Sequence, residues 1–600
     1  MRQSRGWFLA LAVGGSFSAT ISLRAIDLPG VLPAAADQPQ INVDFYLGNN
    51  TSPQMVQDTD FFGDPVTVYN DEAYLDTGAS GILFDPSTAQ YFGIPNSAFN
   101  GATVAYNDVG VAGTGNFTVS QPVRIATSNH VFDPNSDIFS VPQPDLSTYT
   151  APSAPMYFQV GPNNNDTSDE VDQIIAGLNA IDVVGMPAMQ GKVMVLDPKP
   201  VNNFNALDNW DFNSPIPDIF LRTYLYQPGT PYTPNKTASD GTADPGIPTT
   251  DHHIKLSYGS FDQFTTTTPT GAPGPTLAHN PFIGENPVDL FEGKPTAPVP
   301  GIKITLTTNG ITQTSEGNWL LDTGAAASII SQHQAANLGV SYKAGTFGTD
   351  TPDLVDSTGH DIPNQFQFQI QGVGGIETLA GFYLDSLLLR TMEGSAANDN
   401  DPHNLRFRGA PVLVGDITLT DPVSQMTLTL DGVFGMNFLI ASLDPSGLDG
   451  LSIPPIATNY FDWITFDEPN GILGLDVHFP GDTNGDGVVD LSDLSTVLNN
   501  FGKASLLRTD GNFDGADTID LTDLSTVLNN FGVNSIGASA VSAGTVAAPE
   551  PASLAILLIG VFALATRSQK GLGRPAPASP ESDFNAKRPR QQPHFLLQYE

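Results

Sequence analysis

The sequence contains no cysteine, which excludes disulfide bonds, thiolate metal ligands and thiol nucleophiles. Basic residues are also few: 23 lysines and arginines stand against 63 aspartates and glutamates, for a formal net charge of -40 at pH 7. Such a chain repels a phosphate backbone, so nucleic acid is not expected among its partners. The same acidity suits an extracellular or saline setting, although it can also serve solubility alone.

Long helical patterns are scarce, whereas turn-forming residues are plentiful, with 58 glycines and 49 prolines among 600 residues. Short apolar runs separated by such residues predict a mainly β protein with many turns. A chain of this length is too long for a single hydrophobic core, so we expect two to four domains.

A short acidic segment occurs twice. Residues 75–79 read Leu-Asp-Thr-Gly-Ala, and residues 321–325 repeat them without change. One copy would mean little in a chain rich in Asp, Thr and Gly. Each copy is followed, in the same order, by a glycine-rich turn (110–113 and 372–375) and by an apolar segment containing Gly185 or Gly435. The matched order indicates an internal duplication, with a site built from both halves.

The duplicated series resembles the pepsin and retropepsin superfamily of aspartic peptidases over residues 40–478. The resemblance implies a mainly β, bilobal pepsin-like fold. Its expected parts are an N-terminal lobe at 37–200, a partly irregular interlobe insertion at 201–300 and a C-terminal lobe at 301–478. It also implies an aspartic endopeptidase that hydrolyses a protein or peptide substrate without a metal or a covalent intermediate.

By this resemblance Asp76 and Asp322 form the catalytic pair. Two carboxyl groups about 3 Å apart cannot both ionise, so they share one proton. One member accepts a proton from a bound water, and the other donates a hydrogen bond to the scissile carbonyl group. The resemblance also assigns loop-supporting roles: Thr77 and Thr323 would bond across the lobes, Gly78 and Gly324 would let amides approach the carboxylates, and Gly185 and Gly435 would support each loop from beneath.

The two copies depart from the pepsin pattern at neighbouring positions. Ala79 and Ala325 stand where pepsins carry Ser or Thr, as in retropepsins. The second copy reads as having two extra alanines before Ser328, which leaves a contact of this serine with Asp322 open. Tyr106 is the nearest candidate for a flap tyrosine. The fold is therefore more strongly indicated than the activity.

Residues 479–535 contain a second, shorter duplication. From Asp482 to Asp493, oxygen-bearing residues occupy loop positions 1, 3, 5, 7, 9 and 12, a spacing that wraps Ca2+ in about seven oxygens. A helix follows, and its sequence recurs after a second loop that is two residues longer. The expected ligands are Asp482, Asn484, Asp486, Val488 (through its carbonyl group), Asp490 and Asp493, then Asp510, Asn512, Asp514, Asp520 and Asp523.

This module resembles a type I dockerin. The resemblance implies a small α-helical unit built on paired EF-hand-like loops, with Ca2+ as its cofactor and a cohesin-type protein as a possible partner. The alternative for a single loop is a generic acidic surface turn, which two matched copies make improbable.

The N-terminus is typical of a secretory signal. Arg2 and Arg5 precede an apolar run at 7–17 that is followed by small residues. We therefore expect residues 1–36 to form a signal peptide and leader. Cleavage could fall near Ser18 or as late as Ala36.

The C-terminus predicts a sorting segment. After a linker at 536–548, residues 549–570 combine Pro-Glu-Pro, a short apolar run and a basic cluster. This order resembles a PEP-CTERM sorting signal, which implies a hydrophobic helix that meets the membrane and its sorting machinery. A plain single-span anchor is the competing interpretation, although the run is short for one. The polar tail at 571–600 is expected to be disordered.

The leading hypothesis is thus an exported aspartic endopeptidase of the cell envelope or surface, with a calcium-dependent docking module. One alternative is a non-catalytic surface or scaffold protein that keeps the peptidase fold for binding. Another is a dockerin-bearing accessory of a polysaccharide-degrading assembly. The retention of both Asp-Thr-Gly segments favours the enzyme.

Overall fold

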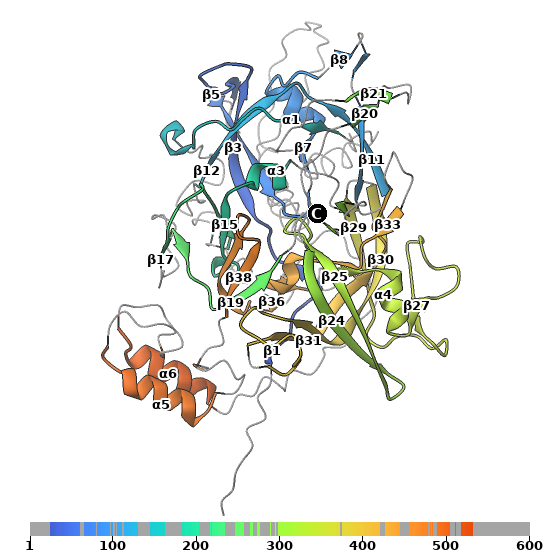
Figure 1. Cartoon of the computed structure of the whole chain (residues 1–600), viewed down its shortest axis with the longest axis vertical. Coiled ribbons are helices and arrows are strands. Elements are labelled where there is room, and N and C mark those ends of the chain that lie inside the picture. Colours follow the sequence, from blue (N-terminus) through green and yellow to red (C-terminus); the bar gives the residue numbers. More distant parts are fainter. Residues whose placement is uncertain are drawn as a thin grey trace, which may run out of the picture.

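The computed structural model describes most of the chain between residues 25 and 531. Within this span it leaves out residues 60–64, 80, 97, 100–101, 104, 111–112, 130–144, 162–181, 203, 205–216, 218, 234–245, 257–264, 268–272, 277–287, 290–293, 296–297, 373–374, 402, 421–426, 445–455, 458, 478–480, 482, 484–488, 504–510 and 512–517. The described part is mainly β with few helices, and its layout is compatible with a bilobal pepsin-like fold (Figure 1).

The N-terminal lobe is built on a ten-stranded sheet in the order β12-β3-β6-β14-β7-β13-β11-β10-β20-β21. Its strands are β3 (Gln40–Leu47), β6 (Asn70–Leu75), β7 (Ile82–Phe84), β10 (Ala105–Gly110), β11 (Gly113–Val119), β12 (Val123–Ser128), β13 (Gln159–Val160), β14 (Val183–Val184), β20 (Thr265–Thr267) and β21 (Pro273–Thr276). Alternate residues of a strand face the same side, so Ile41, Val43 and Phe45 of β3 all enter the core. There Phe45 meets Phe84 edge-on, with ring centroids 5.1 Å apart.

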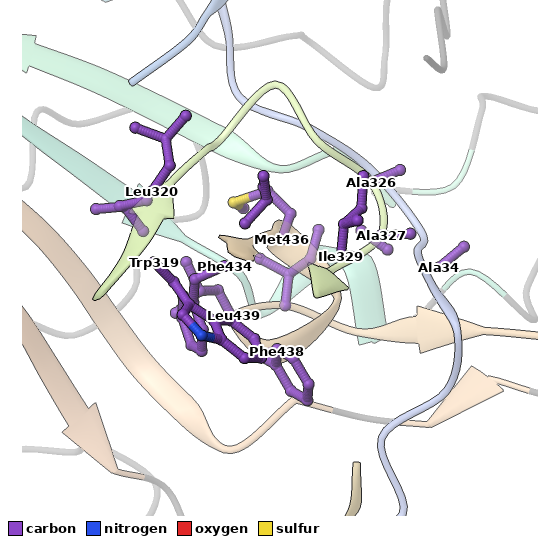
Figure 2. Packing of buried hydrophobic residues seen from close by; sticks show 14 of the residues in the cluster. Ala34, Trp319, Leu320, Ala326, Ala327, Ile329, Phe434, Met436, Phe438 and Leu439 are labelled. Carbon is purple, nitrogen blue, oxygen red and sulfur yellow. The ribbon is translucent and has the colours of Figure 1, made fainter. Parts of the chain in front are cut away.

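The C-terminal lobe is built on an eight-stranded sheet in the order β1-β31-β26-β34-β25-β24-β30-β29. Its strands are β1 (Ile26–Pro29), β24 (Pro298–Thr308), β25 (Ile311–Leu321), β26 (Ile329–Ile330), β29 (Phe366–Gly372), β30 (Gly375–Leu389), β31 (Leu405–Val414) and β34 (Gly432–Phe434). Trp319, Phe434 and Phe438 pack together in its core (Figure 2). The rings of Phe434 and Phe438 are stacked at 5.3 Å.

The two lobes repeat one arrangement of short strands. In the first, β14 pairs in parallel with β6 and antiparallel with β7; in the second, β34 pairs in parallel with β25 and antiparallel with β26. A short helix follows each outer strand, namely α1 (Pro86–Tyr91) after β7 and α4 (Gln332–Asn337) after β26. A single helical turn follows each inner strand, α3 (Met186–Met189) or η3 (Met436–Phe438). The repeat agrees with the duplication that the sequence indicates.

A third sheet joins the lobes. Its five strands run in the order β16-β15-β37-β38-β19, where β15 is Val193–Asp197, β16 is Arg222–Tyr226, β19 is His252–Lys255, β37 is Phe461–Asp467 and β38 is Ile472–Val477. The predicted insertion at 201–300 therefore supplies two strands of this sheet, β16 and β19. Its later hairpin, β20 and β21, extends the N-terminal sheet by pairing Ala105 with Thr267. These four described strands of the insertion thus belong to the sheet that joins the lobes and to the N-terminal sheet.

Residues 25–36 also belong to the fold. β1 pairs in parallel with β31, and β2 (Ala34–Ala35) pairs with β35 (Ser442–Leu443), which pairs with β36 (Ile456–Ala457). Most of the apolar side chains of this segment are buried. A leader that ended at Ala36 would remove these strands, whereas cleavage before Ala25 leaves them in place. Residues 1–24, with the predicted signal sequence, lie outside the described residues.

The remaining elements are short two-stranded pairs, one of them parallel and the others antiparallel, and one helical turn. They are β4 (Val56–Thr59) with β5 (Pro65–Val68), β8 (Ala98–Phe99) with β9 (Ala102–Thr103), β17 (Tyr232–Thr233) with β18 (Ile247–Pro248), β22 (Val288–Asp289) with β23 (Lys294–Pro295), β27 (Val340–Tyr342) with β28 (Leu354–Asp356), β32 (Thr418–Thr420) with β33 (Thr427–Thr429), and η1 (Leu146–Thr148).

Two helices of equal length, α5 (Leu491–Asn500) and α6 (Leu521–Asn530), follow the sheets and lie apart from them in Figure 1. They pack against each other around their own small cluster of buried residues, Val489, Val497, Ile519 and Val527. None of the described helices is long and apolar enough to cross a membrane. The predicted linker, sorting segment and tail at 536–600 lie outside the described residues.

Candidate active site

Each Asp-Thr-Gly segment begins where an inner strand ends. Asp76 follows β6, and Asp322 follows β25. The neighbouring parallel strand holds each turn in the same way, because Asp76 N donates to Val184 O at 3.2 Å and Asp322 N donates to Phe434 O at 3.1 Å. The repeated strand pairing therefore delivers the two acids to equivalent positions.

The structure brings the two acids together. The carboxyl groups of Asp76 and Asp322 share a hydrogen bond, and Asp76 is only 9% exposed. The Oδ1 atom of Asp76 also accepts hydrogen bonds from Gly78 N at 2.6 Å and from Gly324 N at 3.2 Å. Burial raises the pKa of Asp76 above its ordinary value, and the hydrogen bonds from Asp322 and the amides oppose that rise. The pair is thus set up to hold one proton between two acids.

Two threonines join the turns reciprocally. Thr77 Oγ1 donates to Leu321 O at 2.7 Å and accepts from Thr323 N at 3.2 Å. Thr323 Oγ1 donates to Leu75 O at 2.7 Å and accepts from Thr77 N at 3.0 Å. Both side chains are almost fully buried, so these four bonds are shielded from water. They give each predicted threonine the same cross-lobe contacts.

The turn glycines leave room for the acid of the other lobe. A Cβ atom on Gly78 would lie 2.4 Å from Asp322 Cγ, and one on Gly324 would lie 2.6 Å from Asp76 Cγ. Non-bonded carbon atoms do not approach so closely, since contact begins near 3.5 Å. Any side chain at either glycine would therefore push the acids apart.

Gly185 and Gly435 lie beneath the turns in matching contacts. A Cβ atom on Gly185 would be 2.2 Å from Gly81 O, and one on Gly435 would be 2.7 Å from Ala327 O. The amide of the next residue completes each contact, with Met186 N donating to Ala79 O and Met436 N to Ala325 O, both at 2.9 Å. The backbone that follows β14 or β34 thus supports each Asp-Thr-Gly turn.

The two turns have the same length, so the interpretation of two extra alanines in the second copy is wrong. Asp85 caps α1 nine residues after Asp76, and Ser331 caps α4 nine residues after Asp322. In this alignment the counterpart of Ser80 is Ala326, not Ser328. The alanine run resembles an insertion because serine follows Ala79 directly in the first turn, whereas in the second turn Ser328 comes two residues later.

Ser328 supports the turn from the side of Gly435. Its Oγ atom accepts a hydrogen bond from Gly435 N at 2.9 Å and donates to Asn437 Oδ1 at 2.7 Å. The hydroxyl group is therefore engaged by the underlying segment, and it links β26 to η3.

The N-terminal hairpin β10–β11 corresponds to the predicted flap. Tyr106 pairs with Phe117 across it, and Gly110 pairs with Gly113 at its tip. β10 also contacts β32 of the C-terminal lobe, so the hairpin reaches across between the lobes. Residues 111–112 and the side chain of Tyr106 lie outside what the structure describes, and the flap tyrosine stays a prediction.

Behind the first turn lies a buried acid pair that sequence reasoning missed. Asp182 Oδ1 accepts from Asp85 N and its Oδ2 from Thr88 Oγ1, both at 2.7 Å, and it shares a hydrogen bond with Asp71. Burial raises the pKa of Asp182 to about 7. The sequence signal for this pair is weak: Asp182 directly precedes the apolar strand β14. The pair itself joins Asp71 in β6 to a residue more than a hundred positions later, which local patterns do not reveal.

Four predicted calcium ligands fall within the described residues. Asp493 is fully buried; its Oδ1 accepts from Thr483 N at 2.7 Å, and its Oδ2 from Asp490 N at 2.8 Å. Asp523 repeats the second contact with Asp520 N, also at 2.8 Å. In the first loop, residues near both ends thus bond to a buried carboxylate, and in the second loop the described contact is the one at its exit. The described residues contain no group of three acidic or histidine side chains that could hold a metal ion.

The other predicted ligands lie outside the described residues. These are Asp482, Asn484, Asp486, Val488, Asp510, Asn512 and Asp514.

No family model matches the sequence, and no curated protein matches it. Among solved structures, the chain is similar to an aspartic proteinase from Irpex lacteus, at 12% identity and a TM-score of 0.27, over 75% of this chain and 97% of that chain. It is also similar to basic 7S globulin from soybean, at 8% identity and 0.27, over 73% and 95%, and to edgp, at 11% and 0.23, over 74% and 96%. Scores this low do not support an inference about function. Any such inference therefore rests on the geometry of the site.

Proposed function

We propose that this protein is an aspartic endopeptidase that hydrolyses peptide bonds with Asp76 and Asp322. The observation that carries the proposal is the reciprocal threonine bonding, which brings the two acids together with one carboxyl group hydrogen-bonded to the other. A fold kept only for binding has no need of two matched acids at this point. Their matched glycines, which leave space for nothing but the opposite carboxyl group, support the same conclusion.

The chemistry follows from a pair that holds one proton. The ionised carboxyl group removes a proton from a water molecule, whose oxygen attacks the scissile carbonyl carbon. The protonated carboxyl group gives its proton to the carbonyl oxygen, which forms a neutral tetrahedral diol. The carbon–nitrogen bond then breaks as the amine nitrogen takes a proton from one acid and a hydroxyl proton returns to the other. The pair ends with the single proton it began with.

The test is cleavage of an unfolded protein by the full chain between pH 3 and 6. Asp76→Asn and Asp322→Asn should each abolish turnover, because an amide cannot share a proton in this way. Asp350→Asn, at an exposed position of the C-terminal lobe, is the matched control and should leave the rate unchanged. Sensitivity of the wild-type rate to pepstatin would support the proposal, and equal rates in all four proteins would refute it.

The paired helices favour a second role in docking. The same three apolar side chains are exposed on each helix or directly after it: Leu491, Leu498 and Phe501 at 68%, 54% and 44%, and Leu521, Leu528 and Phe531 at 68%, 54% and 45%. Exposed apolar residues that repeat in this way mark an interaction surface. The proposal includes Ca2+ bound by the two loops and a cohesin-type protein as the partner.

Calorimetric titration of the full chain with CaCl2 tests the metal. We expect uptake at the loops, weakened by Asp493→Asn and by Asp523→Asn but not by Asp350→Asn. Absence of any heat of binding in the wild type would refute the calcium role. Export by the N-terminal segment and attachment through the sorting segment at 549–570 complete the proposal, and cell fractionation after deletion of 549–570 tests them.

A further inference from the structure

We infer that Gln38 is a positioning residue for the second catalytic turn, delivered there by the N-terminal segment 25–39, which we term the N-terminal strap. Its consequence for turnover rests on the proposed peptidase function. The strap is not part of either Asp-Thr-Gly repeat, and it adds a contact between the two turns.

The strap begins firmly fixed to the C-terminal lobe. β1 runs parallel to β31, and Asp27 is only 4% exposed within this pairing. Its carboxylate receives two parallel hydrogen bonds from Arg408, at 2.8 and 3.2 Å. Such a two-bond ion pair fixes orientation as well as distance. The first residues of the strap therefore move with the C-terminal lobe.

The middle of the strap passes directly beside the second turn. Ala35 N donates to Ala326 O, and Ala36 N donates to Ala441 O, both at 2.8 Å. Figure 2 shows Ala34 next to the turn that carries Ala326 and Ala327. Only small side chains fit where two backbones lie this close, which accounts for alanine on both segments.

Gln38 then reaches Gly324, the glycine that follows Asp322 and Thr323. Its side chain is 1% exposed, and its Nε2 atom donates to Gly324 O. A carbonyl oxygen can only accept, so the amide nitrogen must face it. The Oε1 atom of Gln38 has no hydrogen-bond partner in the described part of the chain. Among the described residues, the contact with Gly324 is therefore the polar interaction that defines where this side chain points.

Gly324 is held from two directions. Its N–H group donates to Asp76 Oδ1 at 3.2 Å, and its carbonyl oxygen receives Gln38. These two groups belong to the two peptide units that meet at the Cα atom of Gly324, so the φ and ψ angles of this glycine cannot change without weakening one of the bonds. Gln38 consequently acts on the acid pair through Gly324, although it touches neither carboxyl group.

The backbone of Gln38 is itself anchored on the N-terminal lobe side. Asp37 Oδ1 accepts from Gln38 N at 2.8 Å, and its Oδ2 accepts from Leu221 N at 2.6 Å. One residue later, Pro39 O accepts from Leu75 N at 2.9 Å, immediately before Asp76. The end of the strap thus bonds to the strand that presents one catalytic acid while its side chain bonds to the turn that presents the other.

The decisive variant is Gln38→Met, which keeps the length of the side chain and removes the donor. We expect kcat to fall about tenfold with KM within twofold, because a lost buried hydrogen bond misplaces Gly324 without altering the substrate cleft. The two limbs of the pH–rate profile should move closer together, since a loosened pair is less strongly coupled.

Gln334→Met is the matched control. Gln334 belongs to the C-terminal lobe, like Gly324, and is 2% exposed. As in Gln38, its Nε2 atom donates to a carbonyl oxygen (Glu316 O, 3.3 Å), and its Oε1 atom lacks a partner among the described residues. Its hydrogen bond goes to Glu316 in β25 and not to an Asp-Thr-Gly turn, so Gln334→Met should lower the melting temperature while leaving kcat and both pH limbs unchanged. Gln38→Glu should keep most activity at low pH, where a protonated carboxyl group can still donate to Gly324 O, and lose it as that group ionises.

A double-mutant cycle between Gln38→Met and Asp76→Asn, scored by urea midpoints, provides a readout that does not need activity. The two shifts should be non-additive, whereas Gln334→Met and Asp76→Asn should be additive. Additive shifts for Gln38, or an unchanged kcat and pH profile in Gln38→Met, would overturn the inference. A wild-type chain without turnover but with a non-additive cycle would refute the proposed peptidase and leave the positioning contact standing.

Discussion

The two lobes share one topology but surround their buried acids differently. In the N-terminal lobe, Asp44, Asp71 and Asp182 are 0%, 8% and 5% exposed. Burial raises the pKa of Asp44 and of Asp182 to about 7, and it raises that of Asp71 well above its ordinary value. The groups that act on these acids are hydroxyl groups, amides and other acids. At acidic pH these side chains are therefore neutral.

In the C-terminal lobe, acids are matched with bases. Asp399 contacts Lys303 at 2.6 Å and Arg390 at 3.0 Å, and Arg390 also bonds to Glu316 at 2.8 Å. Burial raises the pKa of Asp399, but the hydrogen bonds from Lys303 and Arg390 outweigh it and leave that pKa lowered. The Asp399 side chain therefore stays ionised to a lower pH than an ordinary aspartate does.

The two halves of one duplicated fold thus respond to pH in opposite ways. An acid whose pKa is raised by folding binds its proton more tightly in the native state than in the unfolded chain, so its contribution to stability is complete below about pH 4 and declines up to about pH 7. An acid whose pKa is lowered contributes above about pH 4 and loses its effect as pH falls. The N-terminal lobe is consequently the part suited to acidic conditions.

The largest expected effect is therefore a loss of stability when pH rises from 4 to 7. A shift of about three pH units corresponds to roughly 4 kcal/mol per group as an upper bound, so the free energy of unfolding should fall by several kcal/mol. Urea unfolding across this range measures it, with hydrogen exchange showing the N-terminal lobe opening first.

Asp182→Asn should flatten this pH dependence, because one proton no longer distinguishes the folded from the unfolded chain. Asp350→Asn, at an exposed site, should leave the slope unchanged. A wild-type stability that stays constant from pH 4 to 7, or that rises, would contradict the proposed difference between the lobes.

The glycines beneath the turns test whether the lobes are equivalent in packing. Gly185→Ala and Gly435→Ala should each cost about 3 kcal/mol or more of folding free energy, because the new Cβ atom meets a backbone oxygen that cannot move aside. Gly185→Ala should cost more, since its contact would be 2.2 Å rather than 2.7 Å.

Gly229→Ala is the control for this pair. It lies in open space at a positive φ of 84°, so only backbone strain of about 1 kcal/mol applies. Thermal unfolding of the three variants decides the order. Equal costs at all three glycines would show that the turns are not tightly supported.

The smallest expected effect concerns the ion pairs of the C-terminal lobe. Arg408→Leu leaves Asp27 buried with weaker compensation, so stability at pH 5 should fall by about 2 kcal/mol. Lys343→Leu removes a base whose acid partners, Asp353 and Asp361, are well exposed, and should change stability by less than about 0.5 kcal/mol. Urea midpoints at pH 5 measure both. An equally small change for Arg408→Leu would show that the buried ion pair of Asp27 contributes no more to stability than the exposed pairs of Lys343.

Sequence spacing predicted that Asp76 and Asp322 lie together with their neighbouring threonines and glycines, because each of these residues lies in a short segment with a local pattern. One local feature differs from the prediction: the alanine run at 325–327 reads as an insertion, whereas the caps at Asp85 and Ser331 show turns of equal length. The capping residues are local features of the sequence, and their equal distances from the two acids indicate turns of equal length.

Contacts between distant segments could not be predicted from the sequence. Residues 25–36 were expected to be leader, but their small and apolar side chains pack against strands nearly four hundred residues later. The strands of the insertion, β16 and β19, likewise find partners in other parts of the chain. Short strands without strong alternation do not reveal their partners, because pairing depends on register and on which sheet edge is open.

By itself the sequence determined the duplication, the identity of Asp76 and Asp322, the mainly β character and the two acidic loops near the C-terminus, since all of these are written in local composition and spacing. Only the tertiary structure decided that Gln38 meets Gly324, that Asp71 meets Asp182, and that the groups acting on the buried Asp44, Asp71 and Asp182 are hydroxyl groups, amides and acids. Those pairings arise where strands from different parts of the chain come together, and burial then fixes which polar groups must satisfy one another.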